Sequence, residues 1–330
     1  MKKNILYLLF FISYISFGQE LNLPVWTQYL ADNDFVVSPT YAGIGDNLKI
    51  RANGLTQWVG IKNAPDNQSL YADFRISNRS GIGVSAYNDR NGNTRQKGLK
   101  LSFAHHLILD FKSKQYLSFG LSYNINSFRL DIENFNTTYE IPILDPAITD
   151  DRGLNNSNFD AGFLYRWDNF YFSFNANNLI GKNTDIFNAI NEPGSLLNYQ
   201  IYSGYVITPK RNKYVEFEPS VFFQFFESDR RSATDLNFKY RMFNRRNGDY
   251  YWIGASYRFL NDQVMKPLNL GPMAGILYNK LYFAYSYQMT LNDLSGFNSG
   301  THVVTIGLNL LQSASNCACT RGSSQSYYRL

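Results

Sequence analysis

Alternation of apolar and polar residues runs through most of this chain and limits its fold more than any other feature. Phe170, Phe172 and Phe174 alternate with Ser173 and Asn175, for example. Successive side chains of a strand point to opposite faces, so each alternating segment predicts a β-strand with one apolar and one polar face. Fourteen segments fit: 47–60, 68–77, 81–89, 97–110, 115–128, 157–167, 169–177, 197–208, 213–226, 233–243, 249–259, 270–279, 281–290 and 301–311.

The connections between these segments differ in length in a regular way. Those after even-numbered segments are short, and those after odd-numbered segments are mostly long, notably 129–156 and 178–196. Two connections after odd-numbered segments, 61–67 and 227–232, are only moderately long. Short periplasmic turns and long extracellular loops are typical of outer-membrane barrels. We therefore predict an all-β, up-and-down antiparallel transmembrane β-barrel of about 14 strands, integral to the cell outer membrane and in contact with its lipid.

A soluble β-sandwich is the alternative fold. A sandwich must cover its apolar faces with a second sheet, whereas a closed barrel places lipid outside and water inside and leaves no sheet edge unpaired. Aromatic residues near the predicted turns, such as Trp167 and Tyr251, are typical of the membrane interface, although aromatic residues also favour strands generally. A membrane barrel therefore explains why each strand has one apolar and one polar face.

The ends of the chain suggest how it is organised. Lys2 and Lys3, an apolar run over 5–17 and small residues at 16 and 18 predict a secretory signal peptide over 1–18. Residues 19–46 are expected to form a periplasmic segment or a plug inside the barrel, which spans 47–311. Residues 312–330 are expected to form a mobile periplasmic tail, in which Cys317 and Cys319 form an exposed local disulfide rather than a weak metal site.

Composition and motifs exclude several function classes. The net charge of +5 is too small, and the basic residues too scattered, to predict nucleic-acid binding. The chain has three histidines; two of them, His105 and His106, point to opposite faces of one strand and cannot share a metal. No hydrolase, zinc-protease or nucleotide-binding motif occurs, so we expect no enzymatic activity, cofactor or metal.

Charged residues on the polar faces of the strands are expected to line the lumen. Both signs occur, which favours cross-strand ion pairs that stiffen the wall, with a pore-selectivity lining as the alternative. These candidate lumen charges are Asp73, Arg75, Asp160, Arg166, Glu216, Glu218, Lys239 and Arg241.

A series of short motifs supports a family resemblance. The series runs Gln28-Tyr29-Leu30, Ser38-Pro39-Thr40-Tyr41-Ala42-Gly43, Arg51, Gln57-Trp58, Ala64-Pro65, Gly81-Ile82-Gly83, then Asp89 and Gly92. In order and spacing it resembles the opening of the PorP/SprF family, and the hairpins at 271–285 and 300–310 are also similar. Ser38 and Thr40 replace the Asn and Ala usual in that family. Pro39 and Gly43 suit a turn into the first strand, and Trp58 suits its outer interface.

The resemblance implies a role in type IX protein secretion and gliding motility. Members are outer-membrane components, some of which receive or anchor the C-terminal domain of a secreted adhesin. On this basis we expect as partners a secreted cargo protein and other components of the secretion system. The alternatives are an outer-membrane channel for small solutes and, less favoured, a hydrolase that depends on His302.

The predicted long loop 129–156 is unusually rich in apolar residues for a segment exposed to water. A patch of this kind often marks an interface, although the loop could instead fold into the lumen. The candidate partner-binding residues are Phe135, Tyr139, Ile141, Ile143 and Leu144.

Overall fold

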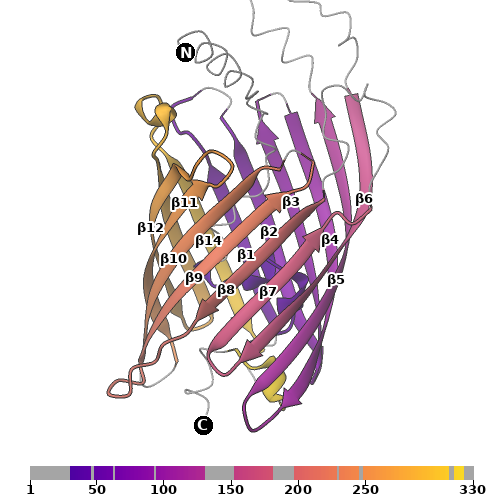
Figure 1. Ribbon diagram of the computed structural model, residues 1–330, viewed down its shortest axis with the longest axis vertical. Coiled ribbons are helices and arrows are strands. Elements are labelled where there is room, and N and C mark those ends of the chain that lie inside the picture. Colours follow the sequence, from indigo (N-terminus) through magenta and orange to yellow (C-terminus); the bar gives the residue numbers. More distant parts are fainter. Residues whose placement is uncertain are drawn as a thin grey trace, which may run out of the picture.

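Fourteen antiparallel strands form one closed barrel in the computed structural model (Figure 1). The structure describes residues 30–45, 48–61, 64–92, 94–130, 152–180, 197–228, 230–244, 248–311 and 316–322. Each strand pairs with its neighbours in sequence, and the first pairs with the last, Leu48 lying opposite Leu310. The strands are β1 (Leu48–Thr56), β2 (Asp66–Ser77), β3 (Ser80–Asn91), β4 (Thr94–Asp110), β5 (Gln115–Leu130), β6 (Arg152–Trp167), β7 (Phe170–Asn177), β8 (Asn198–Tyr205), β9 (Val215–Phe226), β10 (Ser232–Phe243), β11 (Tyr250–Leu260), β12 (Lys266–Tyr278), β13 (Leu281–Thr290) and β14 (Thr301–Leu310).

The predicted barrel and its strand number are confirmed, with shifted boundaries. The first strand, predicted over 47–60, ends at Thr56 because the chain turns at Trp58, which has a φ of 48°. The sixth and twelfth strands begin earlier than predicted, at Arg152 and Lys266. In these extensions hydrogen bonding to the neighbouring strand continues beyond the apolar alternation.

Burial is reversed relative to a soluble protein, as expected where lipid lies outside. Leu101 and Leu121 are 52% exposed, whereas the neighbouring Ser102 and Ser122 are 6% and 1% exposed. The two serine hydroxyls are hydrogen-bonded across β4 and β5 at 2.8 Å, inside the barrel. The polar faces of the strands therefore form the interior, and the apolar faces form the outer surface.

No helix in the described part of the chain is long and apolar enough to cross a membrane.

A short irregular segment, residues 30–45, fills part of the interior. It contains two 3-10 turns, η2 (Asp34–Val36) and η3 (Pro39–Tyr41), and η3 packs against β4, β5 and β6. Ser38 caps η3 by accepting a hydrogen bond from the Thr40 backbone N–H at 3.3 Å. Residues 30–45 lie within the barrel, and we call them the plug.

The wall is uneven in height. Strands β4, β5 and β6 have 17, 16 and 16 residues, whereas β7 and β8 have 8 each. About 9–11 tilted residues suffice to cross the hydrocarbon layer. The wall is accordingly highest on the side of β5 and β6, at the end opposite the short turns (Figure 1). We call the two ends of the barrel the short-turn end and the long-loop end.

Candidate functional site

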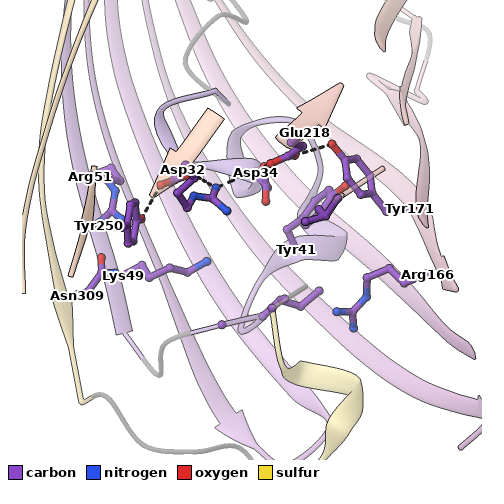
Figure 2. A pocket seen from close by; sticks show the side chains of 15 residues that line it. Asp32, Asp34, Tyr41, Lys49, Arg51, Arg166, Tyr171, Glu218, Tyr250 and Asn309 are labelled. Atoms are coloured by element: carbon purple, nitrogen blue, oxygen red, sulfur yellow. Dashed lines mark hydrogen bonds and ion pairs between the residues drawn. The ribbon is translucent and has the colours of Figure 1, made fainter. Parts of the chain in front are cut away.

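Asp32 of the plug is the centre of an ion-pair cluster inside the barrel. It accepts hydrogen bonds from Lys239 and Arg241 on β10 and from the Tyr250 hydroxyl on β11, the Arg241 contact being 2.7 Å. Burial alone would raise the pKa of Asp32, but Arg241 and Lys239 hold it well below its ordinary value. The plug is therefore attached to the wall through a carboxylate that stays ionised (Figure 2).

The same cluster contains the predicted cross-strand pairing. Arg241 also donates to Glu216, directly opposite on β9, at 2.9 Å. Lys239 lies opposite Glu218 in the strand register but forms its ion pair with Asp32. Glu218 accepts a hydrogen bond from the Tyr171 hydroxyl at 2.7 Å. The sequence pattern placed these four wall charges in the lumen but did not identify Asp32 as their partner.

A small cavity of about 110 Å³ lies between the plug and the wall (Figure 2). Asp34 and Glu218 are among its lining residues, together with Lys49 and Arg166. Burial, and next the proximity of Glu218, raise the pKa of Asp34 to about 7. A polar cavity of this size holds a few water molecules, too few for a continuous water-filled pore.

The short-turn end of the plug is held by the wall and by the C-terminal segment. The Gly43 N–H donates to Asp73 at 3.0 Å, and Arg75 donates to the Gly45 carbonyl at 2.6 Å. The Gly45 N–H in turn donates to the Thr320 carbonyl at 2.9 Å. Asp73 and Arg75, predicted to be lumen charges, thus act as anchors of the plug.

Residues 316–322 correct the expectation of an exposed cysteine pair. Cys317 and Cys319 form a disulfide, but they are 6% and 0% exposed. Arg166 donates to the carbonyl oxygens of Cys319 and Arg321, which draws the segment under the plug. Burial against the barrel, rather than contact with water, is therefore the environment of the disulfide.

Several described residues of the family motif lie in the first strand, in the connection that follows it and in the plug. Arg51 is 2% exposed, donates to the carbonyl oxygens of Ile50 and Leu308, and lies 4.3 Å from the centre of the Tyr282 ring. At the long-loop end, the Gln57 N–H donates to the Pro65 carbonyl at 2.9 Å, with half-buried Trp58 between them in the chain. Pro39 and Gly43 belong to the plug, whereas Gln28 and Tyr29 lie outside the described residues.

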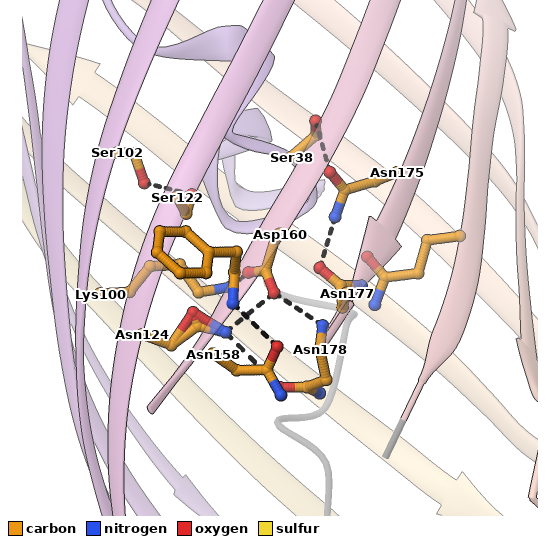
Figure 3. Close-up of polar contacts among 12 residues, drawn as sticks. Ser38, Lys100, Ser102, Ser122, Asn124, Asn158, Asp160, Asn175, Asn177 and Asn178 are labelled. Carbon is orange, nitrogen blue, oxygen red and sulfur yellow. Dashed lines mark hydrogen bonds and ion pairs between the residues drawn. The ribbon is translucent and has the colours of Figure 1, made fainter. Parts of the chain in front are cut away.

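Several side-chain amides lie close to Asp160 inside the barrel (Figure 3). Asp160, on β6, forms an ion pair with Lys100 at 2.6 Å and accepts hydrogen bonds from the Asn124 amide at 2.8 Å and from the Asn178 N–H at 2.9 Å. Asn175 donates to Asn177, which donates to Asn198 on β8. Sequence reasoning identified Asp160 but missed these asparagines, whose signal was their repeated occurrence at inward positions.

Among the described residues, the β7-facing edge of β6 is incompletely paired toward the long-loop end, which we call its upper part. Strand β7 pairs with β6 only up to Ala161. Beyond Ala161, the Leu179 N–H donates to the Phe159 carbonyl. The Asn158 side-chain amide donates to the Ile180 carbonyl and accepts a hydrogen bond from the Ile180 N–H, both at 2.8 Å. Within the described part of the chain, no backbone pairs with β6 above Asn158 on this side. The candidate partner-binding residues Phe135, Tyr139, Ile141, Ile143 and Leu144 lie outside the described residues.

Comparisons with known proteins agree with this geometry. The family model for "Type IX secretion system membrane protein PorP/SprF" matches residues 18–308. No curated protein matches the sequence. Among solved structures, the "CymD monoaromatic hydrocarbon channel" aligns with a TM-score of 0.51 and 11% identity, covering 83% of this chain and 91% of that one.

Two further solved barrels align with lower scores. The Acinetobacter baumannii outer-membrane protein Omp33 aligns at a TM-score of 0.46 and 9% identity, over 80% of this chain and 97% of that one. Outer-membrane phospholipase A from Escherichia coli aligns at 0.36 and 12%, over 89% and 95%. At these identities the likeness concerns the fold alone.

Proposed function

This chain belongs to the PorP/SprF family of type IX secretion system membrane proteins, and we propose that it holds a secreted surface protein at its extracellular rim. It is an integral outer-membrane β-barrel, so the short-turn end faces the periplasm and the long-loop end faces outward. In the proposal the bound partner is the C-terminal domain of the secreted protein, other secretion components deliver it, and the barrel carries out no enzymatic reaction.

The observation that carries the proposal is the upper edge of β6, with which no backbone of the described part of the chain pairs above Asn158. Strand edges with unpaired N–H and C=O groups readily accept another strand, and such β-augmentation is a common way to bind an extended segment. The Phe159 carbonyl faces this edge, and backbone directions alternate along a strand, so the groups of Ser157 and Asn155 face it as well. The side chains of both residues are polar on the outer face, which suits a position above the lipid.

The plug supports a holding role over a transport role. Asp32 and the anchors at Gly43 and Gly45 attach the plug to β2, β10 and β11. A solute channel, the alternative function, would require these contacts to break during every opening. Conductance altered by reversing the charge at Lys239 or Arg241 would favour that alternative.

The first experiment is purification of the full chain from its native outer membrane in mild detergent, with mass spectrometry of the proteins that remain bound. We expect one large secreted protein at a stoichiometric level, held through its C-terminal domain. A barrel that is purified without any partner would contradict the proposed function.

The binding edge is tested by Ser157→Pro, which removes an edge N–H without disturbing the hydrogen bonds to β5. Ser157→Val is the matched control because it keeps the N–H. We expect the proline variant to retain at least about tenfold less partner, which corresponds to the loss of one or two backbone hydrogen bonds. Equal retention by both variants would rule out the edge. Replacement of 135–144 by a Gly/Ser segment tests separately whether that loop contributes.

A further inference from the structure

Strongly exposed apolar side chains lie on two neighbouring connections at the long-loop end of the barrel. The β11–β12 connection (261–265) carries Val264 and Met265, which are 93% and 64% exposed. In the β13–β14 connection (291–300), Phe297 is 76% exposed. We call Val264, Met265 and Phe297 the rim patch.

Val264 and Met265 have an unusual backbone conformation. Their φ angles are 54° and 58°, in the left-handed region that residues other than glycine, asparagine and aspartate adopt with difficulty. The conformation is least favourable for a β-branched residue such as Val264, and Asn-Gly is the pair that usually occupies two successive positions of this kind in a hairpin. A backbone outlier of this kind points to a function for the side chains that it presents.

The β13–β14 connection is fixed to its neighbours on both sides by backbone hydrogen bonds. The Ser299 N–H donates to the Val59 carbonyl at 2.8 Å, and the Val59 N–H donates to the Gly300 carbonyl at 3.1 Å, which attaches the connection to the residues after β1. On the other side, the Leu291 N–H donates to the Leu268 carbonyl of β12 at 2.9 Å. The surface that this connection presents is therefore preformed, which lowers the entropy cost of binding.

The rim patch is surrounded by polar residues and lies beyond the strands. Phe297 stands between exposed Ser295 and Ser299, and exposed Asp262 precedes Val264 by two residues. An exposed apolar patch with a polar border marks a contact surface. The β13–β14 connection rises above the strands at the long-loop end (Figure 1), where a protein outside the membrane can reach it. A second barrel in the same membrane would instead meet the outer face of the wall.

The rim patch also lies across the mouth of the barrel from the upper edge of β6. In the closed order of the strands, β13 is seven strands from β6 in either direction. A protein that spans the mouth can therefore contact both the edge of β6 and the patch.

We propose that the rim patch is a second contact for the secreted surface protein and binds an apolar surface of it. This second contact rests on the proposed function, because it takes the same protein as its partner. Its chemistry differs from that of the β6 edge, which offers backbone hydrogen bonds to an extended segment, whereas the patch offers apolar area to a folded surface. The preformed connection, its place beyond the strands and its position opposite β6 support this partner.

Photo-crosslinking in the native outer membrane identifies what covers the patch. The photoreactive residue p-benzoyl-phenylalanine replaces Phe297 in the full chain and, in a matched control, replaces Phe111. Phe111 is 69% exposed in the short turn between β4 and β5, at the periplasmic end. We expect an adduct with the secreted protein from position 297 and none from position 111. An adduct with a second copy of this chain, or with lipid alone, would overturn the proposed partner.

Retention of the secreted protein during purification tests how much the patch contributes. Val264→Asn combined with Met265→Gly removes two apolar side chains and supplies the residues that this backbone favours, so the barrel should unfold at the same temperature or higher. We expect this variant to retain at least about tenfold less of the secreted protein than the natural chain. Phe111→Ser should retain as much as the natural chain.

The outcomes separate this second contact from the proposed function. Equal retention by the natural chain and by the variant with Val264→Asn and Met265→Gly would overturn the second contact and leave the proposed function standing. A natural chain that is purified without any secreted protein would contradict both. If the variant unfolds at a lower temperature, Phe297→Ser, which leaves that turn unchanged, decides between loss and retention of the partner.

Discussion

Gly81 of β3 lies so close to Ala42 of the plug that a Cβ atom at position 81 would be 2.2 Å from the Ala42 carbonyl oxygen. The same backbone position approaches Gly43, whose φ of 79° suits glycine. Two glycines, one on the wall and one on the plug, therefore allow the plug to lie against the sheet at backbone distance.

Gly81→Ala should push the plug away from the wall. Overpacking of this kind costs about 1–3 kcal/mol, and we expect faster hydrogen exchange over residues 30–45. Gly54→Ala is the control, because a Cβ atom there meets nothing within 4 Å. Hydrogen exchange measured by mass spectrometry distinguishes the two, and identical exchange in both variants would contradict the close approach.

Asp32→Asn should loosen the plug, because Lys239 loses its ion pair with Asp32 and Arg241 keeps only its ion pairs with the wall carboxylates Glu216 and Glu218. Breaking a buried ion pair from one side costs about 3 kcal/mol or more. The comparison variant is Lys114→Gln, which removes an ion pair with Asp168 whose side chains are 58% and 48% exposed. That exposed pair should contribute less than about 1 kcal/mol. Thermal unfolding in detergent gives both values, and a comparable loss from the two variants would argue against a central role for Asp32.

The contacts of the plug should weaken as pH rises toward neutrality and above. The pKa of Asp34 is raised from 3.8 to about 7, so the protonated form contributes stability that is fully present below pH 3.8 and lost as pH rises through 7. Glu218, Asp32, Lys239 and Lys49 are the charged groups that act on it. Asp34→Asn should remove this part of the pH dependence. Hydrogen exchange of 30–45 between pH 5 and 8 checks it, and an unchanged slope in the variant would reject Asp34 as the source.

Reduction of the Cys317–Cys319 disulfide should free the segment that lies beneath the plug. The closed loop is short, so the direct stabilisation is modest, about 1–2 kcal/mol. The larger effect should be local, because the Cys319 carbonyl accepts a hydrogen bond from Arg166. Labelling by a membrane-impermeant maleimide in detergent, before and after a mild reductant, measures accessibility. Thiols that remain unlabelled after reduction would show that the segment stays packed without the disulfide.

The fourteen strands could be predicted because lipid outside and polar groups inside impose a period of two on every strand. The plug lacks that period, and its position depends on contacts between residues distant in sequence, such as Asp32 with Arg241. One signal was present in the sequence. The inward positions of β9 and β10 carry Glu216, Glu218, Lys239 and Arg241 close together, and the plug carries an Asp that no local pattern explains.

The sequence also did not predict the burial of Cys317 and Cys319. A Ser- and Tyr-rich tail after the last strand is typical of an exposed end, but residues 316–322 are held inside by hydrogen bonds from Arg166 and from the Gly45 N–H to their backbone carbonyls. The amide network around Asp160 was missed for a related reason. Alternation placed these asparagines on the polar faces of predicted strands, but it does not show which amides bind one another across neighbouring strands.

The attachment of the plug also constrains the order in which the barrel assembles. Its contacts come from β2 near the start of the chain, from β10 and β11 near the end, and from Thr320 after the last strand. An intermediate that contains only the first strands can offer the plug Asp73, and His106, whose Nε2 lies 3.0 Å from the Ala42 carbonyl oxygen, but neither Lys239 nor Arg241. The full set of plug contacts therefore forms only once β14 has paired with β1, so that completion of the interior coincides with closure of the wall.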